Sequence, residues 1–249
     1  MKRLLFLISV FLMAPKILTA KINVLEPWLP GQDIAVGEQY SYEPEVSFIA
    51  GEYFYELPAR FTYSASPDLE VGARWGIKMV REEAGINDLL LGLKYRIIEK
   101  TEHGPGIAGE AAVSLPTGDF RKNLGTGAAS LLMHWVLEQN ISPVNAYLGL
   151  GVQLNSENDD EVTYGNVFSY HAGAEYVYGE FYNFYGEIKG FNHAWTKISG
   201  TKTIEPYQEL YFSPGMLFKW DDNIHFSSAF LIGLTEESND LGFILSVKF

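Results

Sequence analysis

The chain has 249 residues, of which 14% are aromatic and 24 are glycines, and its formal net charge is −13 at pH 7. It contains no cysteine, which excludes disulfides, thiolate metal sites and a lipid anchor on cysteine. An acidic chain is not attracted to nucleic-acid phosphates by charge, so we expect no nucleic-acid partner.

The N-terminus has the pattern of a secretory signal peptide. Lys2 and Arg3 precede an apolar run, Leu4–Met13, which is too short to cross a bilayer as a helix. Ala20 supplies a small residue at a cleavage point. We therefore expect residues 1–20 to be a signal peptide that is removed.

A proline-containing lead-in, residues 21–43, follows the signal peptide. We expect it either to hang in the periplasm or to enter the lumen of the domain formed by residues 44–249. That domain reads as strand after strand, and the clearest strand is 69–79. There, large apolar residues occupy every second position and charged or glycine residues the others, which is the period of a strand and not of a helix.

The same alternation recurs along the rest of the chain and predicts an all-β fold. We expect about twelve strands, an even number, as in single-chain bacterial membrane barrels. The strands are expected at residues 45–51, 55–63, 69–79, 89–97, 107–115, 131–138, 144–153, 168–178, 184–189, 209–220, 224–234 and 241–249.

The connections alternate between short and long. Short segments rich in turn formers lie at residues 65–68, 102–105, 140–143, 179–180 and 221–223, and longer ones lie at 81–87, 116–127, 155–163, 195–204 and 236–240. Short periplasmic turns and long outer loops are typical of an up-and-down transmembrane barrel. A β-sandwich, the alternative for such a composition, has no reason to alternate its loops in this way.

The last strand ends on Phe249, with Leu241, Phe243, Leu245 and Val247 on the same face. A free strand of this kind would aggregate in water, but it suits a barrel whose outer solvent is lipid. It resembles the terminal strand that the barrel assembly machinery reads in outer-membrane proteins. We therefore expect the cell outer membrane, with its lipid and lipopolysaccharide, to be the location.

Strand parity also predicts which charged side chains point inward. Both signs are present in similar numbers, so they either line a pore or form a salt-bridged plug. The predicted lumen-lining residues are Glu56, Arg60, Glu70, Arg74, Lys78, Lys94, Arg96, Glu110, Glu138, Glu175, Glu187, Lys189, Glu209 and Lys219.

Other polar residues carry weaker signals. His134, His171 and His225 also point inward by parity, and we expect hydrogen-bonded lumen residues here, since their spacing is not that of a metal site. The acidic outer loop 157–161 is expected to be solvated; the alternative is that its carboxylates bind a divalent cation. These carboxylates belong to Glu157, Asp159, Asp160 and Glu161. Ser169 and His171 are displaced along one strand and do not form a nucleophile with its base, so we expect neither an enzyme nor a cofactor.

Three motifs resemble a known family. Asn87-Asp-Leu-Leu-Leu-Gly-Leu-Lys-Tyr-Arg96 is followed by Ser114-Leu-Pro-Thr-Gly-Asp119 and by Leu124-Gly-Thr-Gly127. This order is similar to that of outer-membrane transporters labelled "MetA-pathway of phenol degradation", although Asn87 stands where that family usually has Gly. The resemblance implies a barrel and a channel for small aromatic or other hydrophobic compounds, and it implies no catalytic residues.

The sequence therefore predicts an outer-membrane barrel that passes small molecules through its lumen. The alternative is a closed structural or adhesive barrel that binds a surface partner through its outer loops.

Overall fold

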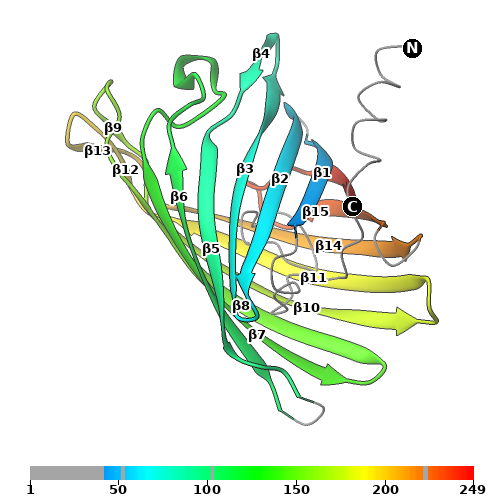
Figure 1. Ribbon diagram of the computed structural model, residues 1–249. Coiled ribbons are helices and arrows are strands. Elements are labelled where there is room, and N and C mark those ends of the chain that lie inside the picture. Colours follow the sequence, from blue (N-terminus) through cyan, green and yellow to red (C-terminus); the bar gives the residue numbers. More distant parts are fainter. Residues whose placement is uncertain (1–41, 52–53, 102–103, 221–223) are drawn as a thin grey trace.

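A computed structural model describes residues 42–51, 54–101, 104–220 and 224–249. In these ranges, twelve antiparallel strands close into a barrel (Figure 1). The predicted signal peptide, residues 1–20, and residues 21–41 of the lead-in lie outside the described residues. The barrel strands are β1 (Tyr42–Ala50), β2 (Phe54–Ser66), β3 (Leu69–Val80), β5 (Leu89–Ile98), β6 (Gly106–Leu115), β7 (Ser130–Ile141), β8 (Val144–Asn155), β10 (Val167–Tyr178), β11 (Tyr182–His193), β14 (Tyr207–Lys219), β15 (His225–Gly233) and β16 (Leu241–Lys248).

The first and last strands close the barrel. β1 pairs antiparallel with β16, from Glu45 opposite Lys248 to Ala50 opposite Phe243. Each of the other barrel strands pairs with its neighbours in chain order. The predicted antiparallel barrel is thus confirmed, and the strand that ends the chain is covered on both edges and leaves no free edge for aggregation.

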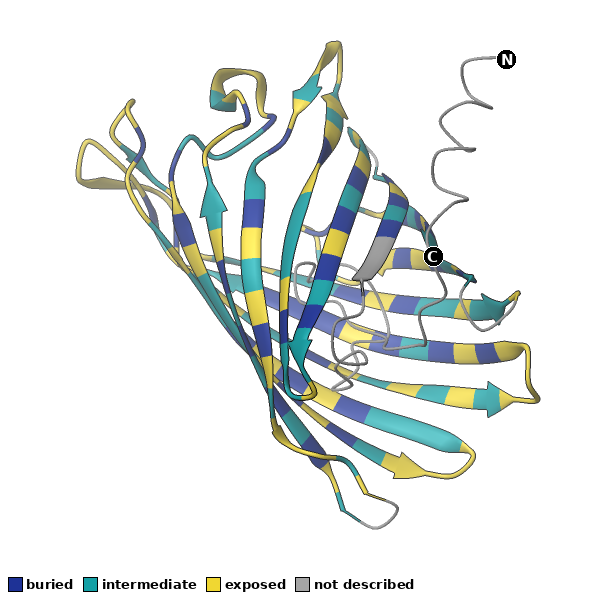
Figure 2. Cartoon of the chain, in the orientation of Figure 1, coloured by how far each residue is buried: buried dark blue, intermediate teal, exposed yellow. Residues whose placement is uncertain are grey.

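The two faces of the wall differ in the way that the alternation predicted. Buried and exposed residues alternate along the strands (Figure 2). On the outside, Trp75 is 46% exposed and Ile77 57%, whereas on the inside Lys94 is 0% and Glu70 1% exposed. A belt of exposed large apolar residues around buried charges is the reverse of a water-soluble fold, and it fits a wall that faces acyl chains.

Glycines on the inner face make room for neighbouring rings. Gly173 lies directly opposite Tyr147, and a Cβ on Gly173 would come within 2.4 Å of the Tyr147 ring. Gly149 lies opposite His171 in the same way, with 2.2 Å between such a Cβ and His171 Nε2. The glycines of the predicted polar face therefore allow aromatic side chains to lie flat against the barrel wall.

Two prolines interrupt the backbone ladders of the barrel. Pro58 in β2 and Pro214 in β14 have no N–H to donate, and the register pairs of β1–β2 and β14–β15 are broken beside them. At the second break the Ser213 hydroxyl donates to the Phe230 carbonyl, at 3.0 Å. The prolines thus leave two interrupted ladders, β1–β2 and β14–β15, which we call the proline seams. The strands β15, β16 and β1 lie between them.

The connections at one end of the barrel are short, and most at the other end are long. The short connection between β1, which ends at Ala50, and β2, which begins at Phe54, is the exception at the long-loop end. The long loops contain four short strands that the sequence did not predict, namely β4 (Glu83–Ile86), β9 (Val162–Thr163), β12 (Thr196–Ile198) and β13 (Thr201–Ile204). No helix in the described ranges has the length and apolarity to cross a bilayer.

The family-like motifs meet in one loop structure, which we call the Asp88 clasp. The Asp88 carboxylate accepts hydrogen bonds from the Gly118 amide at 2.9 Å, from the Thr126 amide at 2.8 Å and from the Thr126 hydroxyl at 3.0 Å. A Cβ on Gly125 would lie 2.2 Å from the same carboxylate, so that position needs a residue without one. The three motifs therefore fix the loop between β6 and β7 to the start of β5.

The clasped loop is tied to the next long loops. Asn158 donates to the Thr126 carbonyl at 3.3 Å, and Arg121 lies 3.2 Å from Asp160. Further along, the Gly165 amide donates to the Thr196 hydroxyl at 3.0 Å. The outer loops from β6 to β14 thus form a connected layer at one rim of the barrel.

We expect Asp88→Ala to release the loop between β6 and β7, because one carboxylate accepts three of its hydrogen bonds. Arg121 and Lys122 are exposed in this loop and are trypsin sites. Each hydrogen bond to a charged group contributes ~1.5–3 kcal/mol, so trypsin should cut the variant at this loop at least about tenfold faster than the wild type. The cleavage rate of the folded protein in detergent is the measurement. Asp159→Ala, in an exposed position nearby, is the matched control, and equal rates for both variants would contradict the clasp.

Candidate functional site

The inner face of the barrel is the candidate site. The alternation of burial places all of the charged residues named by parity on this face: Glu56, Arg60, Glu70, Arg74, Lys78, Lys94, Arg96, Glu110, Glu138, Glu175, Glu187, Lys189, Glu209 and Lys219. Glu45 of β1 points inward as well and is 7% exposed. Whether these residues line a path for a solute is a separate question of function.

Three of these positions and His134 form a row across neighbouring strands, which we call the charged row. Glu70 of β3 lies opposite Lys94 of β5, Lys94 lies opposite Glu110 of β6, and Glu110 lies opposite His134 of β7. Glu110 Oε2 is 3.4 Å from His134 Nδ1. Opposite charges on directly facing positions attract one another, so the row stabilises the wall as well as charging it.

Two ion pairs lie beside the charged row, on β1, β2 and β3. Arg74 donates to Glu56 at 2.5 Å, and the Asn87 side chain donates to the same Glu56 oxygen at 2.6 Å. Arg60 pairs with Glu45, its direct register partner. This side of the interior therefore holds charges of both signs in bonded pairs.

A second group of polar residues crosses β8, β10 and β11. Lys189 Nζ is 2.7 Å from Glu187 Oε1, and the Tyr147 hydroxyl donates to the other Glu187 oxygen at 2.8 Å. The rings of His134 and His171 lie 4.9 Å apart and join this group to the charged row. Both histidines therefore belong to the inner polar lining, as their parity predicted.

Toward the short turns, the inward charges also have partners. Arg96 lies 2.9 Å from Asp68 in the turn between β2 and β3, and Lys100 pairs with Glu138. Asn183 donates to Glu175 at 2.6 Å. Lys219 points inward opposite His225 of β15.

The strands that close the barrel add an inward apolar cluster, which the strand pattern alone did not reveal. A cluster of buried side chains from β1, β11, β14, β15 and β16 faces inward, and we call it the apolar wall. Its members are Ile49, Tyr185, Phe191, Tyr211, Ala229, Leu231 and Ile244. The interior is therefore two-sided: ion pairs predominate over β2 to β11, and the apolar cluster, mixed with polar residues such as Glu45 and Ser246, lies over the strands that close the barrel.

A cavity of about 250 Å³ lies where the two sides meet, at the long-loop end. Ile49, Phe54 and Leu231 line its apolar part, whereas Lys78 and Glu209 line its polar part. Lys78 Nζ is 5.9 Å from the centre of the Phe54 ring. The cavity thus offers an apolar surface and charged groups to the same occupant.

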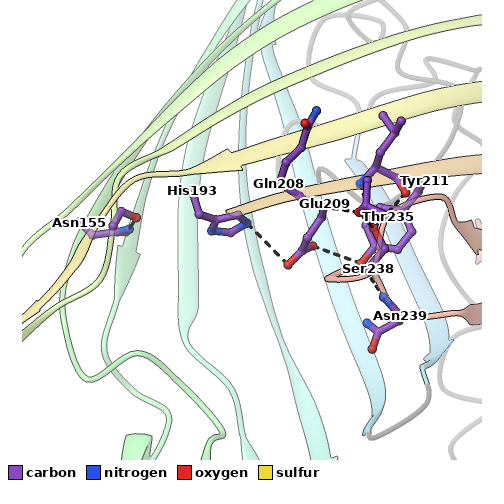
Figure 3. A network of polar contacts seen from close by, with 10 residues as sticks. Asn155, His193, Gln208, Glu209, Tyr211, Thr235, Ser238 and Asn239 are labelled. Atoms are coloured by element: carbon purple, nitrogen blue, oxygen red, sulfur yellow. Dashed lines mark hydrogen bonds and ion pairs between the residues drawn. The ribbon is translucent and has the colours of Figure 1, made fainter. Parts of the chain in front are cut away.

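A network of polar contacts holds one side of this cavity (Figure 3). Glu209 lies between His193 Nε2, at 3.6 Å, and the Tyr211 hydroxyl, which donates to it at 3.1 Å. The Asn239 amide in the loop before β16 donates to the Tyr211 oxygen at 3.2 Å. Thr235 and Ser238 are linked at 2.7 Å in the same loop. The network fixes the side chains of Glu209 and Tyr211 against the loop.

Parity found the inward charges but not the residues that join them. Asn87 contacts Glu56, and Glu45 contacts Arg60. The sequence marked Asn87 only as part of a motif. Strand pairing and the fold of the outer loops decide these contacts. The apolar cavity residues Ile49 and Leu231 had a signal in principle, because they occupy the inward parity of their strands.

Metal binding has little support in the described ranges. No group of three or more potential metal ligands comes together there. In the acidic loop, Asp160 is 3.2 Å from Arg121, and Glu157 accepts a hydrogen bond from the Thr163 hydroxyl at 3.3 Å.

Comparison with solved structures gives the same fold. An outer-membrane channel from Pseudomonas putida F1 matches with a TM-score of 0.76 and 10% identity, over 88% of this chain and 98% of that one. The KdgM porin matches with a TM-score of 0.58, 7% identity and coverage of 83% and 98%. The NanC porin has a TM-score of 0.57, 8% identity and coverage of 84% and 99%. At these identities the likeness confirms the porin-like barrel fold.

No curated protein has significant sequence similarity to the chain. A family model, in contrast, matches residues 63–247, which include all three motifs of the Asp88 clasp. Its description is "Putative MetA-pathway of phenol degradation". The chain belongs to this family of outer-membrane-type β-barrels, as its motifs indicated.

Proposed function

We propose that the protein is an outer-membrane channel that passes small molecules, including aromatic and other hydrophobic compounds, through the barrel lumen. The observation that carries this proposal is the closed barrel with an apolar exterior and a two-sided interior. An apolar exterior stabilises the barrel in lipid, and an interior with both charged and apolar walls can contact both parts of an amphiphilic solute.

The similar structures support passage of a solute in general. The KdgM porin has been solved in complex with disordered oligogalacturonate, which is a property of that porin. The interior of the present chain differs from a wholly polar lumen, because Ile49, Leu231 and Ile244 face inward. This difference, together with the family description, favours less polar solutes here.

The proposal includes the location and the partners of the barrel. The exposed apolar belt would contact outer-membrane lipid and lipopolysaccharide, and the final strand up to Phe249 would be recognised by the barrel assembly machinery. We propose no enzymatic activity. The inward Ser169 and His171 lie on one strand, two residues apart, and no hydrogen bond joins them in the described structure.

A second candidate is the closed barrel whose loops bind a surface partner. Two observations favour it. Lys94 is 0% and Glu70 1% exposed, so these two charges of the row are shielded from water. The outer loops also form a connected layer that could present a stable surface. Conductance separates the two candidates.

We expect the purified protein to give steady current in a planar lipid bilayer. Arg74→Gln and Lys94→Gln each remove a positive charge from the interior, and both should shift the reversal potential in a salt gradient toward cation selectivity. Lys197→Gln, on the exposed strand β12, is the matched control and should leave it unchanged. A silent bilayer with every solute tested would favour the closed barrel. An unchanged reversal potential in both inner variants would remove Arg74 and Lys94 from the path.

We also expect removal of Phe249 to impair assembly, because the terminal aromatic residue would be lost from the strand that the assembly machinery reads. The amount of heat-modifiable barrel in the outer-membrane fraction of cells should fall several-fold. Lys248→Gln keeps the terminal aromatic residue and serves as the control. Equal amounts of assembled protein for the wild type and the truncated chain would rule out this role.

A further inference from the structure

We propose that the cavity at the long-loop end of the barrel is a binding site for a single-ring aromatic carboxylate. The ring would rest against Ile49, Phe54 and Leu231, and the carboxylate would pair with the Lys78 ammonium group. This inference deepens the proposed channel function by assigning a solute class and a place where the solute first binds.

The size and lining of the cavity fit one ring. Its volume is about 250 Å³. Apolar cavities of ~150 Å³ already hold benzene in proteins, so a ring with one small substituent has room here. Ile49 and Leu231 belong to the apolar wall, and Phe54 packs against it. Burying a ring on these side chains removes apolar surface from water, which favours binding.

The charges around the cavity favour an anionic group on the ligand. The Glu56 carboxylate already accepts hydrogen bonds from Arg74 and Asn87. Glu209 already accepts from the Tyr211 hydroxyl and lies 3.6 Å from His193. Lys78, in contrast, is in no ion pair with any residue of the described ranges, although Glu56 is its register partner.

The geometry also sets the ligand's orientation. Lys78 Nζ lies 5.9 Å from the centre of the Phe54 ring, so an anion held by this ammonium group sits next to an aromatic surface. A ligand that joins a carboxylate directly to a ring satisfies both parts at once. A neutral aromatic ligand leaves the Lys78 ammonium group without an anion. A small carboxylate ligand without a ring leaves the apolar side chains of the cavity exposed to water.

Binding of fluorobenzoate to the detergent-solubilised full-length protein tests the proposal, with fluorine NMR as the readout. We expect saturable binding that is at least about tenfold weaker in Lys78→Gln, as expected for the loss of one charge-assisted contact. Lys78→Arg should retain binding to within a few-fold. Lys197→Gln on the outer loops is the matched control and should bind like the wild type. Fluorobenzyl alcohol and fluoroacetate, each lacking one half of the recognition, should bind more weakly than fluorobenzoate.

A second variant keeps the test sharp if Lys78→Gln does not fold. Leu231→Phe adds volume inside the cavity and leaves Lys78 in place, so it should exclude the ring and weaken binding similarly. Circular dichroism and heat-dependent gel mobility establish that each variant used is folded. Fluorobenzoate binding that is unaffected by Lys78→Gln and Leu231→Phe, or equally weakened by Lys197→Gln, overturns the site.

Failure of the site and failure of the channel have different signatures. Conductance without fluorobenzoate binding would overturn the site and leave the channel proposal standing. Binding that depends on Lys78 in a protein that never conducts would support the site and favour the closed barrel. The two measurements therefore do not depend on each other.

Discussion

Closure of the backbone hydrogen-bond ladder around the barrel is the constraint on which the rest of the structure depends. In a lipid environment an unpaired backbone amide costs several kcal/mol, so a strand can cross only if both of its edges are paired. The pairing of β1 with β16 meets this condition for the two ends of the sheet. Once the barrel is closed, strict alternation assigns every side chain of a strand to the outside or the inside. Because the outside faces lipid, the ionisable side chains of the strands must lie inside.

Placing charges inside creates the second requirement, which is that each has a partner. The charged row meets this requirement by setting opposite signs on facing positions, as between Lys94 and Glu110. Arg74, in contrast, reaches diagonally from its position opposite Arg60 to Glu56. The strands that close the barrel carry fewer charges on their inner face and add an apolar cluster there. The result is an interior with two chemical characters, and the cavity lies on the boundary between them.

The sequence predicted the parts of this fold that depend on local periodicity. Alternation over residues 69–79 and 89–97 identified both the strands and the face of Arg74 and Lys94, because a strand gives a residue only two possible directions. Loop length identified the two ends of the barrel. The contacts of Asp88 with Gly118 and Thr126 could not be predicted, because they join residues about thirty or more positions apart through the fold of the outer loops. The cavity was missed because it draws on six strands and on an apolar inner face that no single strand indicates.

The two proline seams have a mechanical consequence. β15, β16 and β1 form a group of three strands whose outer ladders are interrupted, at Pro58 on one side and at Pro214 on the other, whereas the ladders within the group run without a gap. Since local opening follows the weakest cooperative boundary, amide protons along those interrupted ladders should exchange with solvent before those elsewhere in the wall. The most apolar part of the interior would then also be the most deformable part of the shell.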